Sequence, residues 1–239
     1  MTSTPQTPPT RPLEPQKRAI VIGASSGIGA ALVRELARSG YRVAAVARRE
    51  AKLQELRESV NTAVSQSLVS IYSHSVANTD EIPTMFQTIV QELGGLDVIV
   101  YAAGVQPSVT IDEYNFEKDR NMVEVNLLGG IAWLNQAALR FERAGQGSIV
   151  GIGSVAGDRG RVGSPVYNTS KAGFATYLES LRNRLTRHGV AVTTIKPGYV
   201  DTVLLRENAS NPFWVISPQE AAAQIHKAVK RRKQTVYVP

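Results

Sequence analysis

The chain alternates between short apolar runs and longer segments in which apolar residues recur with helical spacing. The apolar runs predict strands at 18–23, 41–47, 68–74, 96–102, 147–153, 190–196 and 235–238. Strands that alternate with helices in this way are typical of a parallel sheet covered on both faces. With right-handed crossovers, the pattern predicts an α/β fold: a doubly wound parallel sheet of about seven strands with helices on both faces. The last strand is expected at a sheet edge.

Composition favours a single globular domain. The chain has 239 residues, of which 43% are hydrophobic and 20% charged, enough to bury a large core. We predict one domain over 17–239, preceded by a disordered tail over 1–16 that is rich in proline and threonine. The absence of cysteine excludes a disulfide framework and a thiolate site. The histidines are not paired at metal-ligand spacing, so no metal is expected.

The net charge of +7 raises the question of an anionic partner. The densest basic run lies at the end of a predicted helix, where cations complement the helix dipole, and it comprises Lys227, Lys230, Arg231, Arg232 and Lys233. No nucleic-acid-binding motif accompanies it. A basic protein that binds an anionic surface stays open as a hypothesis. No segment approaches the roughly 20 apolar residues of a membrane span, and a cytoplasmic location is the default expectation.

The first strand leads into a glycine-rich turn, with Gly23, Gly27 and Gly29, and then into an amphipathic helix. Glycines at such a turn let the backbone approach a pyrophosphate, whose charge is met by the N–H groups at the start of the helix. The spacing departs from the usual dinucleotide fingerprint, in which the first two glycines are about two residues apart. A glycine turn that binds no nucleotide is the alternative.

The second strand ends at Arg48, Arg49 and Glu50, about where a dinucleotide site reads the adenosine ribose. A guanidinium suits a 2′-phosphate, whereas a carboxylate would accept a 2′-hydroxyl. We therefore expect NADP(H) in preference to NAD(H), with Arg48 as the first candidate and Arg49 as the second. Alternatively, both arginines are solvated at the start of the next helix and Glu50 reaches a hydroxyl.

Tyr167 and Lys171 are separated by about one helical turn and should share a helix face. An ammonium near a phenol favours the phenolate, so the pair is a candidate general acid. The alternative is a chance pair on an exposed helix.

In this order along the chain, the motifs resemble the classical short-chain dehydrogenase/reductase family over about 17–239. The resemblance rests on the glycine turn, Ala102-Ala103-Gly104 after the fourth strand, Asn126, Ser154, Tyr167 with Lys171, and Pro197 to Thr202 after the sixth strand. It implies a Rossmann-type fold and hydride transfer between NADP(H) and a carbonyl or secondary alcohol. It also implies a homodimer or homotetramer, formed through the helices around Asn126 and Tyr167.

The resemblance also implies a role for each site residue. Ser154 would hydrogen-bond the substrate carbonyl, Tyr167 would protonate the developing alkoxide, and Lys171 would lower the tyrosine pKa and bind the nicotinamide ribose. Asn126 would anchor a water of the proton relay. The cofactor would contact Gly23, Ser25, Ser26, Gly27, Ile28, Gly29, Arg48, Arg49, Ala103, Gly104, Tyr167, Lys171, Pro197, Gly198, Val200 and Thr202. Individually, these residues have structural alternatives such as a strand-end turn, a helix hydrogen bond or a loop cap.

The chain departs from the family pattern at three places, one of which is Ile22 where a threonine frequently precedes the first glycine. Tyr101-Ala102 stands where the family commonly has two asparagines, which puts a polar tie to the neighbouring strand in doubt. Ser75 stands where an aspartate usually holds the adenine amino group, so the adenine contact is open and Ser75 is not assigned to the site.

Substrate and regulation are less constrained. Phe213 and Trp214 lie where the family places its lid, and they either cover an apolar or ring-shaped substrate or pin the loop to the protein. The segment that contains Arg159 and Arg161 resembles a subgroup that includes reductases of keto sugars on polyprenyl phosphate. These two arginines either contact an anionic substrate or face water. A non-catalytic protein that binds NADPH as a sensor is the rival hypothesis to an enzyme.

Overall fold

The computed structural model describes residues 17–208, 212 and 214–239. The expected tail over 1–16 and the lid residue Phe213 lie outside the described residues, and the proposed domain boundary stays a prediction. The strands are β1 (Arg18–Ile22), β2 (Arg42–Ala47), β3 (Val69–Ser73), β4 (Val98–Tyr101), β5 (Gly147–Ile152), β6 (Val190–Pro197) and β7 (Thr235–Val238). The α-helices are α1 (Gly27–Arg38), α2 (Glu50–Val64), α3 (Ile82–Leu93), α4 (Phe116–Val123), α5 (Gly129–Ala144), α6 (Pro165–Leu185), α7 (Val203–Asn208) and α8 (Pro218–Lys230).

The strands form one seven-stranded parallel sheet in the order β3-β2-β1-β4-β5-β6-β7. The predicted fold class is confirmed, and each predicted strand overlaps an observed one. β7 lies at the sheet edge, as expected. The strand order reverses between β1 and β4, and ligands of doubly wound sheets bind at the carboxyl ends of the strands near such a switch point.

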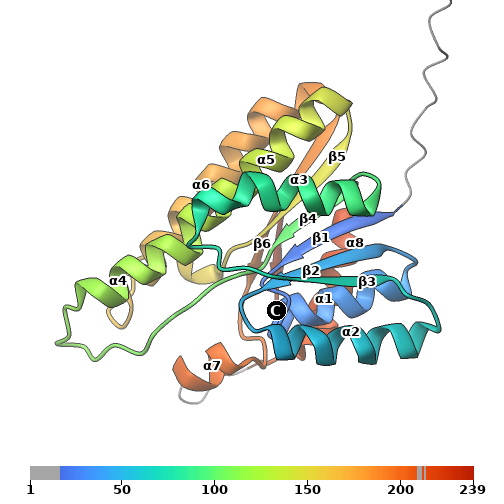
Figure 1. The fold of residues 1–239 in the computed structure, drawn as a ribbon. Helices are drawn as coiled ribbons and strands as arrows, with labels where there is room; N and C mark the ends of the chain where they lie inside the picture. Colours follow the sequence, from blue (N-terminus) through green and yellow to red (C-terminus); the bar gives the residue numbers. More distant parts are fainter. Residues whose placement is uncertain (1–16, 209–211, 213) are drawn as a thin grey trace, which may run out of the picture.

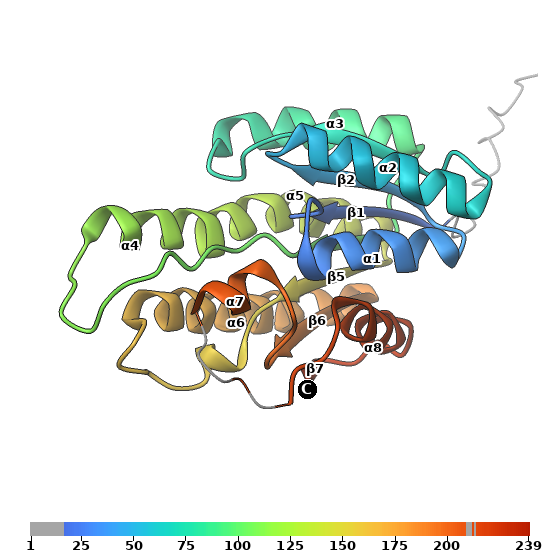
Figure 2. The same cartoon turned by 90° about the horizontal axis from the view of Figure 1, so that it is seen from below.

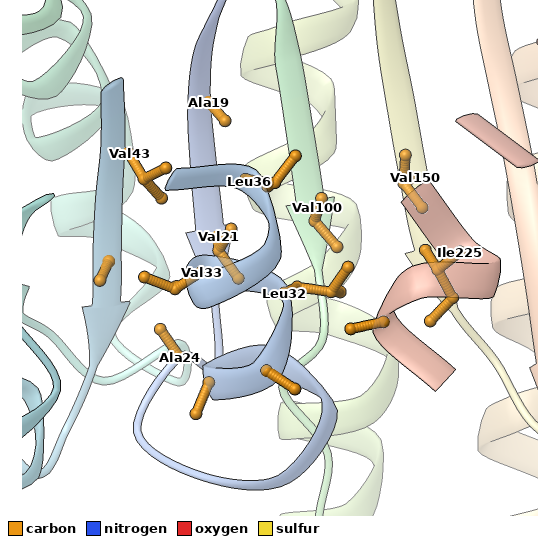
Figure 3. Close-up of a cluster of buried hydrophobic side chains, with 14 of the residues drawn as sticks. Ala19, Val21, Ala24, Leu32, Val33, Leu36, Val43, Val100, Val150 and Ile225 are labelled. Atoms are coloured by element: carbon orange, nitrogen blue, oxygen red, sulfur yellow. The ribbon is translucent and has the colours of Figure 1, made fainter. Parts of the chain in front are cut away.

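Helices cover both faces of the sheet (Figures 1 and 2). One face packs against α1, α2 and α8, where Leu32 and Leu36 of α1 meet Val21, Val100 and Ile225 (Figure 3). The other face packs against α3, α5 and α6, with a second core built from their large side chains. Because both faces are covered, the central strands are apolar at almost every position, which explains the continuous apolar runs in the sequence.

Local signals set the ends of the helices near the site. α6 begins at Pro165, which suits a first helical position because it needs no N–H partner there. α8 begins with a capping box in which Ser217 and Glu220 bond each other's backbone N–H groups. A π-helical turn, η2 (Glu124–Leu128), separates α4 from α5. Among the described helices, none combines the length and apolar character needed to cross a membrane.

Candidate active site

The glycine turn between β1 and α1 is shaped by close backbone contacts. Gly23 and Gly27 have φ values of 85° and 54°, a region that side chains disfavour. A Cβ on Gly23 would lie 2.4 Å from the backbone nitrogen of Ala103, and one on Gly29 would lie 2.2 Å from the oxygen of Gly23. Ser26 precedes α1 in an extended conformation and makes no side-chain cap, so the first N–H groups of α1 are left for a ligand.

Arg48 and Arg49 both line the cavity beyond this turn, but their side chains are used differently. The Arg49 guanidinium donates to the hydroxyls of Ser25 at 2.9 Å and Ser26 at 2.7 Å. No side-chain hydrogen bond involves Arg48 within the described part of the chain; only its carbonyl oxygen accepts a bond, from Ser73. Arg49, the second candidate from the sequence, is therefore the arginine held against the glycine turn.

The cavity extends from this turn past the carboxyl ends of β4, β5 and β6. It brings together every predicted site residue except Asn126: Gly23, Ser25, Ser26, Gly27, Ile28, Gly29, Arg48, Arg49, Ala103, Gly104, Ser154, Tyr167, Lys171, Pro197, Gly198, Val200 and Thr202. The described lining contains arginine, lysine and histidine but no aspartate or glutamate. Such a lining attracts an anion, and a dinucleotide fits it.

Tyr167 and Lys171 project from the first turns of α6 and are 8% and 5% exposed. The Ser154 side chain lies close enough to the Tyr167 hydroxyl to act on its pKa. The Lys171 Nζ donates to the carbonyl oxygen of Ile152 at 3.2 Å and lies 5.8 Å from the centroid of the Tyr167 ring. The hydroxyl of Ser154 also accepts a hydrogen bond from the Ala156 N–H at 3.0 Å. A serine, a phenol and an ammonium therefore meet at one point of the cavity.

Burial controls the protonation of this group. Burial raises the pKa of Tyr167, while the neighbouring Ser154 hydroxyl and the charge of Arg161 act in the opposite direction. It lowers the pKa of Lys171 from 10.5 to about 8. The net shift at the tyrosine is thus upward, opposite to the lowering by Lys171 expected from the sequence. At neutral pH the phenol is protonated, as a proton donor must be.

Asn126 lies behind the cavity, in the η2 turn. Its side chain accepts from the Val105 N–H at 2.8 Å and donates to the Val105 oxygen at 2.9 Å and to Ser170 at 3.1 Å. The Tyr101 hydroxyl donates to the carbonyl oxygen of Val125 in the same turn at 2.5 Å. The family's asparagines are absent here, which put a polar contact from β4 to the neighbouring strand in doubt. Tyr101 instead makes a polar contact from β4 to the η2 turn.

The cavity also contains residues that the sequence did not indicate. Beyond the end of β3 it is lined by His74 and Val76, whereas Ser75 does not contribute. The centroid of the His74 ring lies 5.7 Å from that of Trp133 in an edge-on arrangement, and the His74 Nε2 lies 3.5 Å from the Glu81 carboxylate. Burial lowers the pKa of His74. Only the position of His74 at the end of an apolar run could have suggested a place near the cavity.

At the opposite end, α7 contributes Val203, Leu204 and Leu205 to the lining. Trp214 is 75% exposed and does not line the cavity, so in this structure it does not cover a substrate. Arg159 and Arg161 are exposed as well. This end of the cavity is therefore mainly apolar, and neither arginine lines it.

A doubly wound sheet with a glycine turn at its switch point, and with a serine, a tyrosine and a lysine beside it, defines a Rossmann-type oxidoreductase. The chain belongs to the short chain dehydrogenase family, whose model matches residues 17–212. It is 34% identical to an uncharacterized oxidoreductase of Myxococcus xanthus over 93% of this chain and 87% of that protein. It is 33% identical to an uncharacterized oxidoreductase of Staphylococcus epidermidis over 78% of this chain and 79% of that one.

Solved structures show the same fold. The crystal structure of gox2181 superposes with a TM-score of 0.84 at 26% identity, covering 93% of this chain and 94% of that one. A short-chain dehydrogenase from Sphingobium yanoikuyae, solved in complex with NADPH, gives 0.84 at 22% identity over 93% and 87%. ElxO, solved with NADP bound, gives 0.83 at 20% identity over 93% and 97%.

Proposed function

We propose that the protein transfers a hydride between NADP(H) and a carbonyl or secondary alcohol substrate, with Tyr167 as the general acid or base. The observation that carries the proposal is the single cavity shared by the glycine turn, Ser154, Tyr167 and Lys171. The dinucleotide, when bound, supplies or accepts the hydride. The expected cytoplasmic location and homo-oligomeric state stay predictions.

The residues of the chain divide the remaining work. The turn after β1 offers N–H groups and the positive end of α1 to the pyrophosphate. Ser154 donates to the substrate oxygen and holds it beside Tyr167. In reduction, the Tyr167 hydroxyl gives its proton to the developing alkoxide, and in oxidation the phenolate takes the proton from the alcohol. Lys171, at 5.8 Å from the ring, stabilises the phenolate by its charge.

The test is Tyr167→Phe, which removes the proton donor and keeps the ring that packs in the site. A positioned acid contributes about 10²–10⁴-fold, so turnover should fall by about that factor while the Kd for NADPH stays within about twofold. NADPH oxidation should be followed with ketones, keto sugars and β-ketoacyl thioesters. The matched control is Tyr177→Phe on the same helix, because Tyr177 bonds Asn135 away from the cavity.

Full turnover by Tyr167→Phe would reject the acid assignment. NADPH binding without turnover on the whole panel, in the wild-type protein, would instead favour the non-catalytic sensor. The apolar lining by Leu204 and Leu205 makes ketones with apolar substituents the first compounds to try.

The preference for NADP(H) is proposed from Arg48 and Arg49. A hydrogen bond to a charged group contributes about 1.5–3 kcal/mol, equivalent to roughly 10–100-fold in affinity. The double variant Arg48→Ala/Arg49→Ala should lose about this factor for NADPH and much less for NADH. The two single variants then rank the arginines, and an unchanged NADPH/NADH affinity ratio in the double variant would reject both as phosphate readers.

A further inference from the structure

Three polar side chains meet behind the active site without lining its cavity. Asp158 directly follows the short turn η3 (Val155–Gly157) that begins after Ser154. The ammonium of Lys196, in β6, donates to one carboxylate oxygen of Asp158, and the hydroxyl of Tyr237, in β7, donates to the other at 3.1 Å. The Lys196 Nζ also lies 5.4 Å from the centroid of the Tyr237 ring.

This cluster is a partly buried ion pair. The side chains of Lys196 and Asp158 are only 16% and 30% exposed. The hydrogen bond from Lys196 holds the pKa of Asp158 below its usual range, and the same contact raises the pKa of Lys196. Both groups are therefore charged throughout the neutral range, and reduced contact with water makes their attraction stronger than that of an open surface pair.

On one side the cluster continues into the backbone of the Ser154 turn. The Gly157 N–H donates to the carbonyl oxygen of Ser154 at 3.1 Å, and the Asp158 N–H donates to the carbonyl oxygen of Val155 at 3.2 Å. The Ser154 hydroxyl accepts from the Ala156 N–H inside the same turn. Since these bonds close the turn on itself, the place of the Asp158 carboxylate and that of the Ser154 hydroxyl are coupled.

On the other side it continues into the turn after β6. Lys196 directly precedes Pro197 and Gly198, which line the cavity. The Gly198 N–H donates to the oxygen of Val238 at 2.8 Å, and Val238 directly follows Tyr237. Lys196 and Tyr237, the two partners of Asp158, are thus the chain neighbours of Pro197 and Val238, and Val238 accepts the hydrogen bond from Gly198.

A third set of contacts reaches α6. Asn168, the neighbour of Tyr167, donates to the carbonyl oxygen of Arg159 at 3.2 Å. A Cβ on Gly157 would lie 2.8 Å from the carbonyl carbon of Lys171, so the turn packs directly on the helix backbone. The segment that carries Asp158 therefore touches α6 beside both of its proposed catalytic residues.

We infer that Asp158, Lys196 and Tyr237 form a positioning cluster that holds the Ser154 turn in register with the Pro197-Gly198 turn. The inference rests on the proposed function, because these turns carry the proposed substrate-binding serine and part of the proposed cofactor site. Misplacement by about 1 Å can cost about 10²-fold in rate, so a link between the turns matters for the chemistry although it touches neither reactant.

The first test compares Asp158→Asn, Lys196→Met and Tyr237→Phe in single-turnover oxidation of NADPH by the best ketone. We expect about tenfold slower turnover in the first two variants and about threefold in the third, with the Kd for NADPH and the substrate KM within about twofold. The charge-reversed pair Asp158→Lys/Lys196→Asp should regain part of the rate. The matched control is Glu55→Gln, which breaks the exposed pair with Lys52 on α2 and should leave the rate unchanged.

The second test is hydrogen–deuterium exchange of the protein without cofactor. Asp158→Asn and Lys196→Met should each speed exchange in both turns, at 154–158 and 197–200, and leave α2 unchanged. If Asp158→Asn does not fold, Lys196→Met and Tyr237→Phe carry both tests. Turnover within twofold of wild type and unchanged exchange at the far turn would overturn the inference. If the variants speed exchange in both turns but the wild-type protein reduces no carbonyl compound, the link between the turns is supported and the proposed reductase function is rejected.

Discussion

Two buried cations at opposite ends of the sheet have different surroundings. Arg18 begins β1 and is 4% exposed, whereas Lys171 lies beyond the carboxyl end of β5 and is 5% exposed. The two are therefore almost equally withdrawn from water. Their partners differ in charge and in number.

Arg18 has a carboxylate as its counter-charge and a backbone carbonyl as a second partner. Its guanidinium donates to both oxygens of Asp97, at 2.8 and 3.1 Å, and to the carbonyl oxygen of Gly94 at 2.6 Å. Its backbone N–H donates to Asp97 as well. Such a bidentate pair joins the start of β1 to the segment before β4 and offsets the desolvation of both charges.

Lys171 has no carboxylate partner among the described residues. Its one hydrogen bond goes to the Ile152 oxygen, although an ammonium can donate three. Burial without a counter-charge is what lowers its pKa to about 8. A buried cation without a counter-charge beside a cavity is a candidate functional group, which agrees with the role proposed for Lys171, whereas the pairing of Arg18 with Asp97 is a structural contact.

Lys171→Met should separate the two buried cations most clearly, because it should lower turnover without lowering folding stability. Lys171→Met removes the charge that we propose stabilises the Tyr167 phenolate, and turnover should fall by about 10²–10³-fold. Folding stability at neutral pH should be unchanged or higher by roughly 1–3 kcal/mol, because an unpaired buried ammonium is replaced by an apolar group. Turnover and urea unfolding measure the two effects. Lys52→Met, on the surface of α2, is the control, and a loss of stability in Lys171→Met would contradict the comparison.

The same substitution at Arg18 should have the opposite outcome. Arg18→Met leaves the largely buried carboxylate of Asp97 without its guanidinium partner, and breaking a buried ion pair in this way typically costs about 3–5 kcal/mol. Turnover per folded molecule should stay within about twofold of wild type. Urea unfolding should show the loss, and Arg120→Met, which breaks an exposed pair with Glu117, should cost less than about 1 kcal/mol. Equal costs for the two variants would show that Arg18 is no more than a surface charge.

The strands, the glycine turn and the Tyr167–Lys171 pair could be predicted from the sequence because each has a local pattern. A strand buried on both faces must be apolar throughout, so β1 and its neighbours are visible as apolar runs, and a glycine turn must follow where backbone approaches backbone. Tyr167 and Lys171 are visible because one helical turn joins them. Arg18 and Asp97 are 79 positions apart, and their pairing depends on how β1 and β4 align.

The details of the site depend on directions that residue spacing does not contain. Arg48 and Arg49 are neighbours at the end of β2, so the sequence alone does not say which of them contacts the glycine turn. The backbone direction at the start of α2 makes Arg49 the one that bonds Ser25 and Ser26. His74 enters the cavity lining in place of Ser75 because of how the chain leaves β3. Packing after β3 and β4 decides these contacts, so they appear only in three dimensions.

The titration of Lys171 gives the smallest and most specific test of the comparison. The unfolded chain binds this proton with a pKa near 10.5 and the folded chain with a pKa of about 8. Between these values the unfolded state holds more protons, so stability rises with pH through this window. From pH 7.5 to 9.5 the contribution should amount to roughly 2 kcal/mol.

Urea unfolding of the wild-type protein and of Lys171→Met across that range isolates this contribution, because all other groups titrate in both proteins. The difference in unfolding free energy between them should shrink as the pH rises and the ammonium loses its proton. Parallel curves for wild type and Lys171→Met would mean that Lys171 is not held as an unpaired buried cation.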